Sequence, residues 1–268
     1  MPTNKRQRQK EARRQRQEAM KIAQQRAARR RQGIRLAALL ITVIAVMLLI
    51  GVFRGGDDDK TDVTAGDKST STTAPAGAKA EFGKTDCPDE DGESERTTAF
   101  TDSFKKCIDP KKSYTAVIEF DAGTMEVELA ADESPVTVNN FVSLARHKFY
   151  DGVVCHRVLK GFMAQCGDPE GTGSGGPGYT IGEEPPKSGK YAIGQLAMAK
   201  TGAPHSTGSQ FFIIVGEQGA SLPPQYSLLG TVKVGLDVAR KIEADGADAD
   251  PTPPAVLHKI LKVTIKES

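Results

Sequence analysis

The chain of 268 residues is long enough for one or two domains. Its net charge of +2 conceals a marked asymmetry: residues 1–35 carry 13 Lys and Arg against two Glu, a net +11, whereas the remainder carries 23 Lys and Arg against 32 Asp and Glu, a net −9. A basic head joined to an acidic body excludes one uniformly charged surface and indicates that the two parts meet different environments.

Residues 36–53, LAALLITVIAVMLLIGVF, contain no charged side chain. As a helix they would be about 27 Å long, close to the thickness of a bilayer's hydrocarbon core. A buried core helix usually shows a polar stripe, and Thr42 is the only clearly polar residue here. A cleaved secretory signal is the stronger alternative, but the basic stretch before it is unusually long and no small-x-small site follows. We predict an uncleaved single-span anchor with a cytoplasmic N-terminus and an extracytoplasmic body.

The basic head, residues 1–35, could be read as a nucleic-acid-binding arm. It has no aromatic residue to stack on bases, and it adjoins the predicted span. Topology determination and attraction to anionic lipid explain the same charges more simply, so we expect a lipid bilayer and no nucleic acid as its partner.

Residues 54–85 are rich in Gly, Asp, Ser, Thr, Ala and Pro and predict a flexible linker. The following lead-in, residues 86–112, is irregular and polar but contains two cysteines. Outside the cytoplasm a Cys87–Cys107 disulfide would tie this segment down, and two free thiols are the alternative. No cysteine is spaced with a histidine as a metal site requires, so no metal is expected.

From residue 113 the pattern changes to that of a compact body. Residues 114–120 and 124–130 predict a hairpin, in which Met125, Val127 and Leu129 face inward. Residues 133–150 predict a helix that Ser134 can cap, with Pro135 in its first turn and four apolar residues on one face: Val138, Phe141, Val142 and Ala145.

Further strands are predicted at 192–200, 209–216, 226–235 and 260–268, and a short helix at 235–244 with Val238, Ala239 and Ile242 on one side. In the last strand Leu261, Val263 and Ile265 alternate with polar residues. Many strands and two helices predict a mainly β fold, a closed antiparallel barrel capped by two α-helices.

The stretch CHRVLKGFMAQCGD, residues 155–168, reads as another hairpin. Strand alternation places Cys155 on the face of Arg157, and it places Cys166 on the face opposite Gln165. If Arg157 and Gln165 point into one groove, the two thiols diverge, so we do not expect them to form a disulfide, although a bulge would undo this argument. The glycine-rich run at 167–178 lacks the Gly-Lys-Ser/Thr ending of a phosphate loop and is better read as a surface loop.

Two segments that occur in this order along the chain, HRVLKGFMAQCGD and GSQFFI, strongly resemble the cyclophilin family of peptidyl-prolyl cis-trans isomerases. The order of FYDG, GTGSGGPGY and AMA around them also matches, and the resemblance covers roughly residues 113–267. It implies an eight-stranded antiparallel barrel, an enzyme that acts on proline-containing polypeptides, and no cofactor.

By this resemblance Arg157 is the catalytic hydrogen-bond donor, and Gln165 orients it or the substrate backbone. Residues that are expected to bind substrate fall into two groups. The proline pocket would be walled by Phe162, Met163, Phe212 and Leu222, and the adjoining groove would be lined by Ala199 and Gln210, with Tyr226 at a position where a histidine is frequent. Without the family match, Phe162, Met163 and Phe212 could equally be core residues and Arg157 could serve a surface ion pair.

Ser221 stands where many cyclophilins have a tryptophan at the pocket rim, and the chain has no tryptophan. Because cyclosporin usually rests on that residue, we expect it to inhibit weakly. Two other functions compete with an anchored isomerase: a module that holds proline-containing segments with incidental catalysis, and a membrane-to-nucleic-acid tether through residues 1–35.

Overall fold

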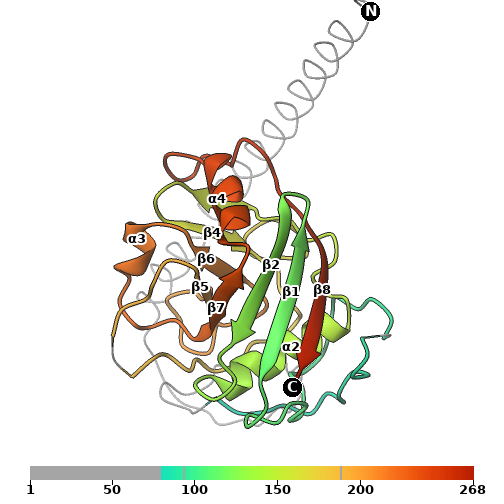
Figure 1. The fold of residues 1–268 in the computed structure, drawn as a ribbon. Coiled ribbons are helices and arrows are strands. Elements are labelled where there is room, and N and C mark those ends of the chain that lie inside the picture. Colours follow the sequence, from blue (N-terminus) through green and yellow to red (C-terminus); the bar gives the residue numbers. More distant parts are fainter. Residues whose placement is uncertain (1–79, 93, 188) are drawn as a thin grey trace, which may run out of the picture. The chain divides into compact units, whose positions relative to one another are not determined.

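The computed structural model describes residues 80–92, 94–187 and 189–268, and these form one eight-stranded antiparallel sheet with three helices. The strands lie in the order β3-β4-β6-β5-β7-β2-β1-β8, and Figure 1 shows α2 and α4 at opposite ends of the curled sheet. The elements are β1 (Tyr114–Phe120), β2 (Gly123–Leu129), α2 (Pro135–Arg146), β3 (Arg157–Leu159), β4 (Met163–Cys166), β5 (Gln195–Met198), β6 (Phe211–Ile214), α3 (Glu217–Ala220), β7 (Leu228–Val234), α4 (Leu236–Ala244) and β8 (Ile260–Glu267).

Within the described ranges, no helix combines the length and the apolar character needed to cross a membrane. The predicted basic head, the predicted anchor at 36–53 and most of the predicted linker lie outside those ranges.

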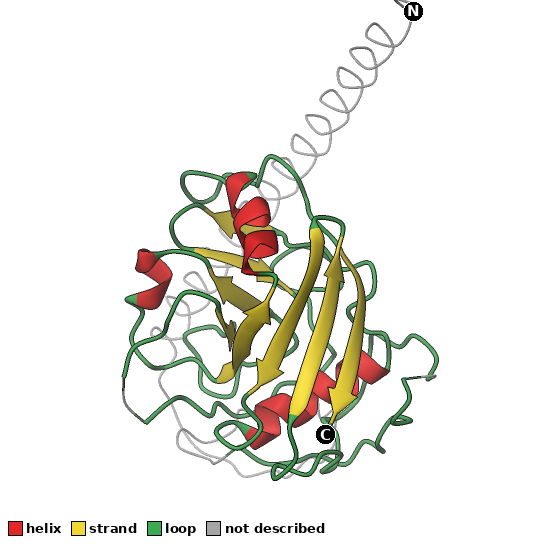
Figure 2. Cartoon of the chain, viewed as in Figure 1, coloured by secondary structure: helices red, strands yellow, loops and turns green. Residues whose placement is uncertain are grey.

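The sheet is open, so the predicted closed barrel is wrong in this respect. Its edges are β3 and β8, which do not pair with each other. Residues 152–155, which precede β3, instead form backbone hydrogen bonds with residues 258–260 around an isolated bridge between Val154 and Lys259. The bonds to the start of β8 come from the segment before β3 and not from β3 itself, so no ladder closes the sheet. The open architecture is visible in Figure 2, where the yellow strands curl without closing.

The predicted amphipathic helix corresponds to α2, but its N-terminus is capped differently from the prediction. Ser134 makes no side-chain capping bond; its hydroxyl donates instead to the carbonyl of Glu184. The Glu184 carboxylate accepts the free N–H groups of Val136 and Thr137, at 3.2 and 2.8 Å. A helix N-terminus carries partial positive charge and unpaired donors, so a carboxylate from a distant loop satisfies it well.

Most predicted inward-facing residues are buried, including Met125, Val127 and Leu129 on β2. Leu261 on β8 is the exception, because its side chain is 53% exposed. Glu119 pairs with Lys262 and Phe120 with Ile260, so Leu261 is the extra residue of a bulge. The bulge breaks the two-residue alternation and turns this leucine outward.

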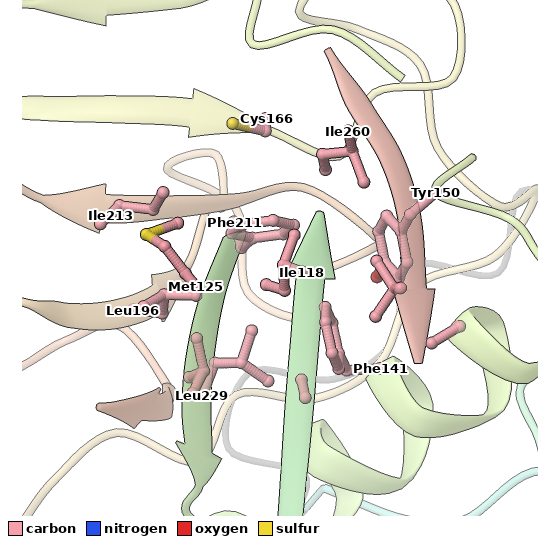
Figure 3. Close-up of a cluster of buried hydrophobic side chains, with 14 of the residues drawn as sticks. Ile118, Met125, Phe141, Tyr150, Cys166, Leu196, Phe211, Ile213, Leu229 and Ile260 are labelled. Carbon is pink, nitrogen blue, oxygen red and sulfur yellow. The ribbon is translucent and has the colours of Figure 1, made fainter. Parts of the chain in front are cut away.

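Aromatic and aliphatic side chains fill the space between α2 and the concave face of the sheet (Figure 3). Phe141 of α2 lies 4.9 Å from the ring of Tyr150 and 5.8 Å from that of Phe211, measured between centroids. Leu196, Phe211 and Ile213 reach this core from β5 and β6. The core therefore fixes one face of the strands whose other face carries the candidate site.

Both cysteine pairs are disulfides. Cys87 is bonded to Cys107, the pairing that the sequence favours, with 5.4 Å between Cα atoms. Cys155 is bonded to Cys166, which we did not expect. The alternation argument fails because the ladder begins only at Arg157, so Cys155 lies outside the strand and its side chain turns into the core beside Cys166.

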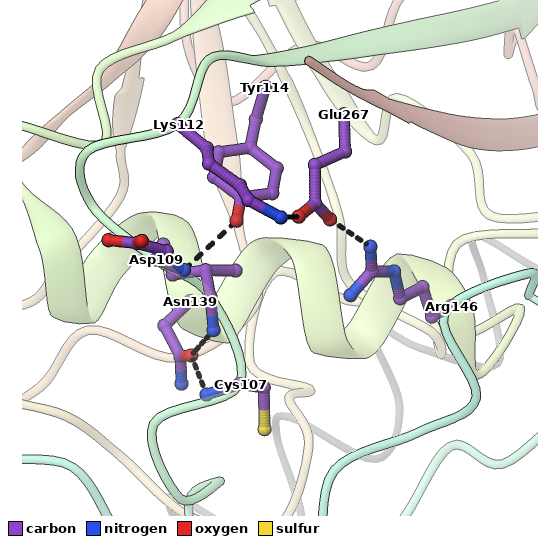
Figure 4. A network of polar contacts seen from close by, with 8 residues as sticks. Cys107, Asp109, Lys112, Tyr114, Asn139, Arg146 and Glu267 are labelled. Atoms are coloured by element: carbon purple, nitrogen blue, oxygen red, sulfur yellow. Dashed lines mark hydrogen bonds and ion pairs between the residues drawn. The ribbon is translucent and has the colours of Figure 1, made fainter.

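The lead-in is integrated into the body. Phe104 and Ile108 are buried in the main core, and Gly83 and Thr85 donate hydrogen bonds to the backbone at residues 103–104. Asn139 of α2 accepts the N–H groups of Cys107 and Ile108, at 2.7 and 3.2 Å, and donates to the carbonyl of Lys105. Nearby, the hydroxyl of Tyr114 accepts the N–H of Asp109, and Glu267 of β8 binds both Lys112 and Arg146 (Figure 4).

Replacing Asn139 with alanine is expected to destabilise the protein by about 2–4 kcal/mol, because three backbone groups of the lead-in lose their partner at a buried position. Chemical denaturation measures the change in the free energy of unfolding. Thr137→Val is the matched control on the same helix, since the buried Thr137 hydroxyl has no hydrogen-bond partner among the described residues. Equal losses in both variants would contradict the assigned role of Asn139.

Candidate active site

Four neighbouring strands place one residue each in a continuous cross-strand row. Arg157 pairs with Gln165, Gln165 with Phe212, and Phe212 with Ala197. Side chains in one row of a sheet point to the same face, and alternate residues point to the other. This row faces away from the main core, which instead takes the intervening residues Ala164, Cys166, Phe211 and Ile213.

The residues on the outer face form a second, smaller hydrophobic cluster. Met163 and Phe212 are 2% and 5% exposed within it, and the partly buried Phe162, Leu222 and Tyr226 pack against them. The rings of Phe212 and Tyr226 meet edge to face with centroids 5.4 Å apart. The aromatic residues that could have been ordinary core are thus separated from the core by the thickness of the sheet.

A pocket opens in this second cluster, and it gathers nearly all the residues that the sequence nominates. Its walls are Arg157, Phe162, Met163, Gln165, Ala199, Lys200, Phe212, Leu222 and Tyr226. Gln210 lies in the adjoining groove, which shares Gln165, Ala199 and Lys200 with the pocket. The pocket offers an apolar floor with one guanidinium at its edge, which suits a small apolar ring attached to a polar backbone.

Two edges of the Arg157 guanidinium have different partners. Nε donates to both carboxylate oxygens of Asp250 at 3.0 Å, and Nη2 forms an ion pair with the same group. Nη1 faces the pocket, where it lies 3.4 Å from Oε1 of Gln165 and 3.7 Å from the sulfur of Met163. The guanidinium carbon lies 5.7 Å from the centre of the Phe162 ring, a favourable cation–π distance.

Sequence reasoning missed two charged residues of the site. Asp250 lies in the loop between α4 and β8, where no sequence motif marks it. Lys200 follows the predicted Ala199 and lies two residues after the end of β5. The hydrogen bond from Arg157 lowers the pKa of Asp250 below its usual value, against a smaller opposing effect of burial. Lys200 Nζ lies 6.0 Å from the centre of the Tyr226 ring.

A chain of amide hydrogen bonds connects the arginine to the glycine-rich loop. Gln165 Nε2 donates to Gln210 Oε1 at 2.8 Å, and Gln210 Nε2 donates to the carbonyl of Gly175 at 2.9 Å. Each amide uses its oxygen toward the arginine side and its nitrogen toward the loop. The chain fixes the orientation of both glutamines and hence the acceptor that Gln165 offers to Arg157.

Asp168 organises the glycine-rich loop from within. Its carboxylate is fully buried and accepts the N–H groups of Glu170, Thr172, Gly173 and Gly175, at 2.5–3.1 Å, together with the Thr172 hydroxyl. Burial alone would raise the pKa of Asp168, but these hydrogen bonds lower it below the usual value. The surface loop predicted at 167–178 is therefore a structured wall of the groove.

Among the residues that the structure describes, no three His, Cys, Asp or Glu side chains are grouped so as to hold a metal ion. The chemistry available at the pocket is that of hydrogen-bond donors, above all a permanently charged guanidinium.

Comparison with known proteins now identifies the family. The family described as cyclophilin type peptidyl-prolyl cis-trans isomerase/CLD matches residues 115–265, which is more than half of the chain.

The chain belongs to the cyclophilin family.

Bacterial peptidyl-prolyl cis-trans isomerases are among the curated relatives of this cyclophilin. The probable peptidyl-prolyl cis-trans isomerase B of Mycobacterium tuberculosis is 39% identical over 160 residues, covering 52% of this chain and 51% of the relative. The chain thus spans about half the length of the mycobacterial B proteins that it matches. The peptidyl-prolyl cis-trans isomerase B of Bacillus subtilis is 43% identical over 123 residues, covering 46% of this chain and 85% of the relative.

A solved structure shows the same fold. The crystal structure of a cyclophilin-type peptidyl-prolyl cis-trans isomerase from Cryptosporidium parvum superposes with a TM-score of 0.53 at 28% identity, covering 57% of this chain and 98% of that one. That protein was also crystallised in the presence of the dipeptide Ala-Pro. In the present cyclophilin, Ser221 ends α3 beside the pocket residue Leu222, and its hydroxyl donates to the carbonyl of Glu217. The weak cyclosporin inhibition expected from Ser221 stays a prediction.

Replacing Asp168 with asparagine is expected to destabilise this cyclophilin by about 3 kcal/mol at pH 7, because an amide cannot accept all the hydrogen bonds of the buried carboxylate. Since the pKa of Asp168 is lower in the folded than in the unfolded protein, the carboxylate's contribution is full above the unfolded pKa of about 3.9 and is lost as the pH falls through the folded pKa.

The difference in free energy of unfolding between wild type and Asp168→Asn should therefore shrink below about pH 4. Denaturant titrations from pH 3 to pH 7 measure it, with the exposed Asp132→Asn as the control. A difference that stayed constant down to the acid limit would contradict a carboxylate-specific role.

Proposed function

We propose that this cyclophilin catalyses cis-trans rotation of X–Pro peptide bonds in polypeptide clients. The observation that carries the proposal is the placement of Arg157 Nη1 at the edge of the apolar pocket formed by Phe162, Met163, Phe212 and Leu222. A proline ring fits the apolar floor, and the amide on its nitrogen then lies within reach of the guanidinium.

The reaction needs neither a nucleophile nor a proton acceptor. Rotation about a peptide bond meets a barrier of roughly 18–20 kcal/mol because the resonance of the amide must be broken. In the twisted state the proline nitrogen regains lone-pair character and can accept a hydrogen bond. A donor that is stronger toward this state than toward the planar amide lowers the barrier, and a guanidinium serves well because it does not lose its proton.

The pocket provides the environment in which one such hydrogen bond matters. Met163 and Phe212 exclude water from the floor, and Gln165 holds the pocket edge of the arginine from the side opposite Asp250. Charge–dipole interactions are stronger in an apolar surround than in water, and groups held in place beforehand need no reorganisation during the reaction. The isomerase names of the relatives and the presence of Ala-Pro in the homologous crystal support the same assignment.

Replacing Arg157 with alanine in the full-length protein is expected to lower kcat/KM for a proline-containing peptide about a hundredfold, the typical effect of removing one transition-state donor. Lys160→Ala is the matched control, because Lys160 is a cation of the same hairpin that pairs with Asp248 outside the pocket. A protease-coupled or NMR exchange assay measures the rate. Equal rates in wild type and Arg157→Ala would favour the alternative, a module that holds proline segments with incidental catalysis.

We further propose that the domain works on the outer side of a bacterial membrane, held by residues 36–53 as an uncleaved anchor. The length and uncharged character of that run support the anchor, and the basic residues 1–35 support a cytoplasmic N-terminus. All four cysteines are paired in disulfides, which persist in oxidising compartments and are rare in the cytosol. Clients would then be proteins that fold after export.

Protease added to intact cells should cut the chain between the anchor and the domain, while the basic head stays protected until the cells are lysed. Immunodetection of a tag at either end measures both events. Full protection of the C-terminal tag in intact cells would contradict the extracytoplasmic location and would leave the proposed isomerase activity unaffected.

A further inference from the structure

Asp250 contacts the side of Arg157 that faces away from the pocket. It binds Nε and Nη2, whereas Nη1 is directed to Gln165 and Met163. Asp250 itself is not among the residues that line the pocket. The carboxylate therefore occupies one edge of the planar guanidinium and leaves the other edge available to a bound amide. This arrangement is expected of a group that orients the arginine, and not of a group that competes with the substrate for it.

The loop that carries Asp250 is fixed to the catalytic hairpin by backbone bonds. Ala247 N–H donates to the carbonyl of Val158 at 2.9 Å, and Lys160 N–H donates to the carbonyl of Ala247 at 3.0 Å. These bonds form a short parallel bridge between Ala247 and Leu159 of β3. Asp250 is thus held three residues from a point that is hydrogen-bonded to Arg157's own strand.

The other end of the loop is also held. The N–H of Ala255 donates to the carbonyl of Asp245 at 2.7 Å, which closes the loop at its base. The imidazole of His258 lies between two carboxylates, with Nδ1 2.9 Å from Asp121 and Nε2 3.1 Å from Asp245. Both ends of the segment that presents Asp250 are therefore attached to the sheet or to α4.

Such a fixed partner matters because an arginine side chain is flexible. Holding it in one geometry costs rotamer entropy, and a group ordered before the substrate binds does not incur that cost during the reaction. Gln165 restrains only Nη1 of the guanidinium, and the Phe162 ring contacts only one flat face of the guanidinium plane. Asp250 supplies the remaining restraint, at the edge opposite Gln165.

We propose that Asp250 is a positioning residue, which holds the Nε and Nη2 edge of Arg157 so that Nη1 points at the prolyl amide. The inference rests on the proposed isomerase function and adds to it a specific residue outside the pocket. Asp250 does not touch substrate and acts only through the arginine.

Asp250→Ala in the full-length protein is expected to lower kcat roughly two- to fivefold with KM unchanged, a modest effect because the ion pair is half exposed. Asp250→Glu should recover part of the loss by restoring the carboxylate. Asp248→Ala is the matched control, since Asp248 lies in the same loop, is 89% exposed and pairs with Lys160 instead. In the Arg157→Ala background, Asp250→Ala should have no further effect, because its role depends on that arginine.

A second readout is independent of activity. The Nε–H of Arg157, assigned by NMR through its loss in Arg157→Ala, should be rigid and slow to exchange in wild type and in Asp248→Ala, and mobile in Asp250→Ala. Unchanged mobility of this group in Asp250→Ala would overturn the inference about Asp250, whether or not the wild-type protein is active. An inactive wild-type protein would refute the proposed isomerase function instead. A rise in kcat/KM on removal of Asp250, or an equal loss in the presence and absence of Arg157, would also overturn it.

Discussion

Antiparallel pairing of β3, β4, β6 and β5 brings Arg157, Gln165, Phe212 and Ala197 into one cross-strand row, and the rest of the site depends on this register. A slip of one residue in any pair would exchange the pocket face for the core face. The main core prevents such a slip, because Phe211 and Ile213 are fully buried on the opposite face and could not be turned to solvent without a large loss of hydrophobic free energy. Packing on one side of the sheet thus fixes chemistry on the other.

Around this row, polar groups are arranged so that each restrains the next. The buried Asp168 carboxylate holds the glycine-rich loop, the loop carbonyl of Gly175 holds Gln210, and Gln210 holds Gln165. On the other side the backbone of β3 holds the loop that carries Asp250. The single guanidinium at the centre is the group that a prolyl amide would meet, and most of the surrounding polar structure bears on its orientation.

Arg157, Phe162, Met163, Gln165 and Phe212 could be predicted from sequence because they lie in two long motifs, HRVLKGFMAQCGD and GSQFFI, and the alternation of Met163, Gln165 and Phe212 fits the observed faces. The failures have physical causes. Leu261 faces outward because a bulge interrupts the alternation, and Cys155 reaches Cys166 because it lies just before the ladder begins. The role of Asp250 could not be predicted from the sequence, because it depends on a loop that folds back on β3. The contact joins Asp250 to Arg157, which lies 93 positions away in the chain.

The lead-in shows that the folded unit of this cyclophilin extends upstream of the family match. The family match starts at residue 115, yet Phe104 upstream of it is only 1% exposed and packs on His147 and Tyr179, with ring centroids 5.6 and 6.3 Å away. A fragment that began at the family's limit, residue 115, would lack Phe104 and so expose the rings of His147 and Tyr179 that pack on it. It would also remove the backbone groups of residues 105–108 that Asn139 binds. An expression boundary for this domain therefore belongs upstream of Phe104, rather than at residue 115 where the family match starts.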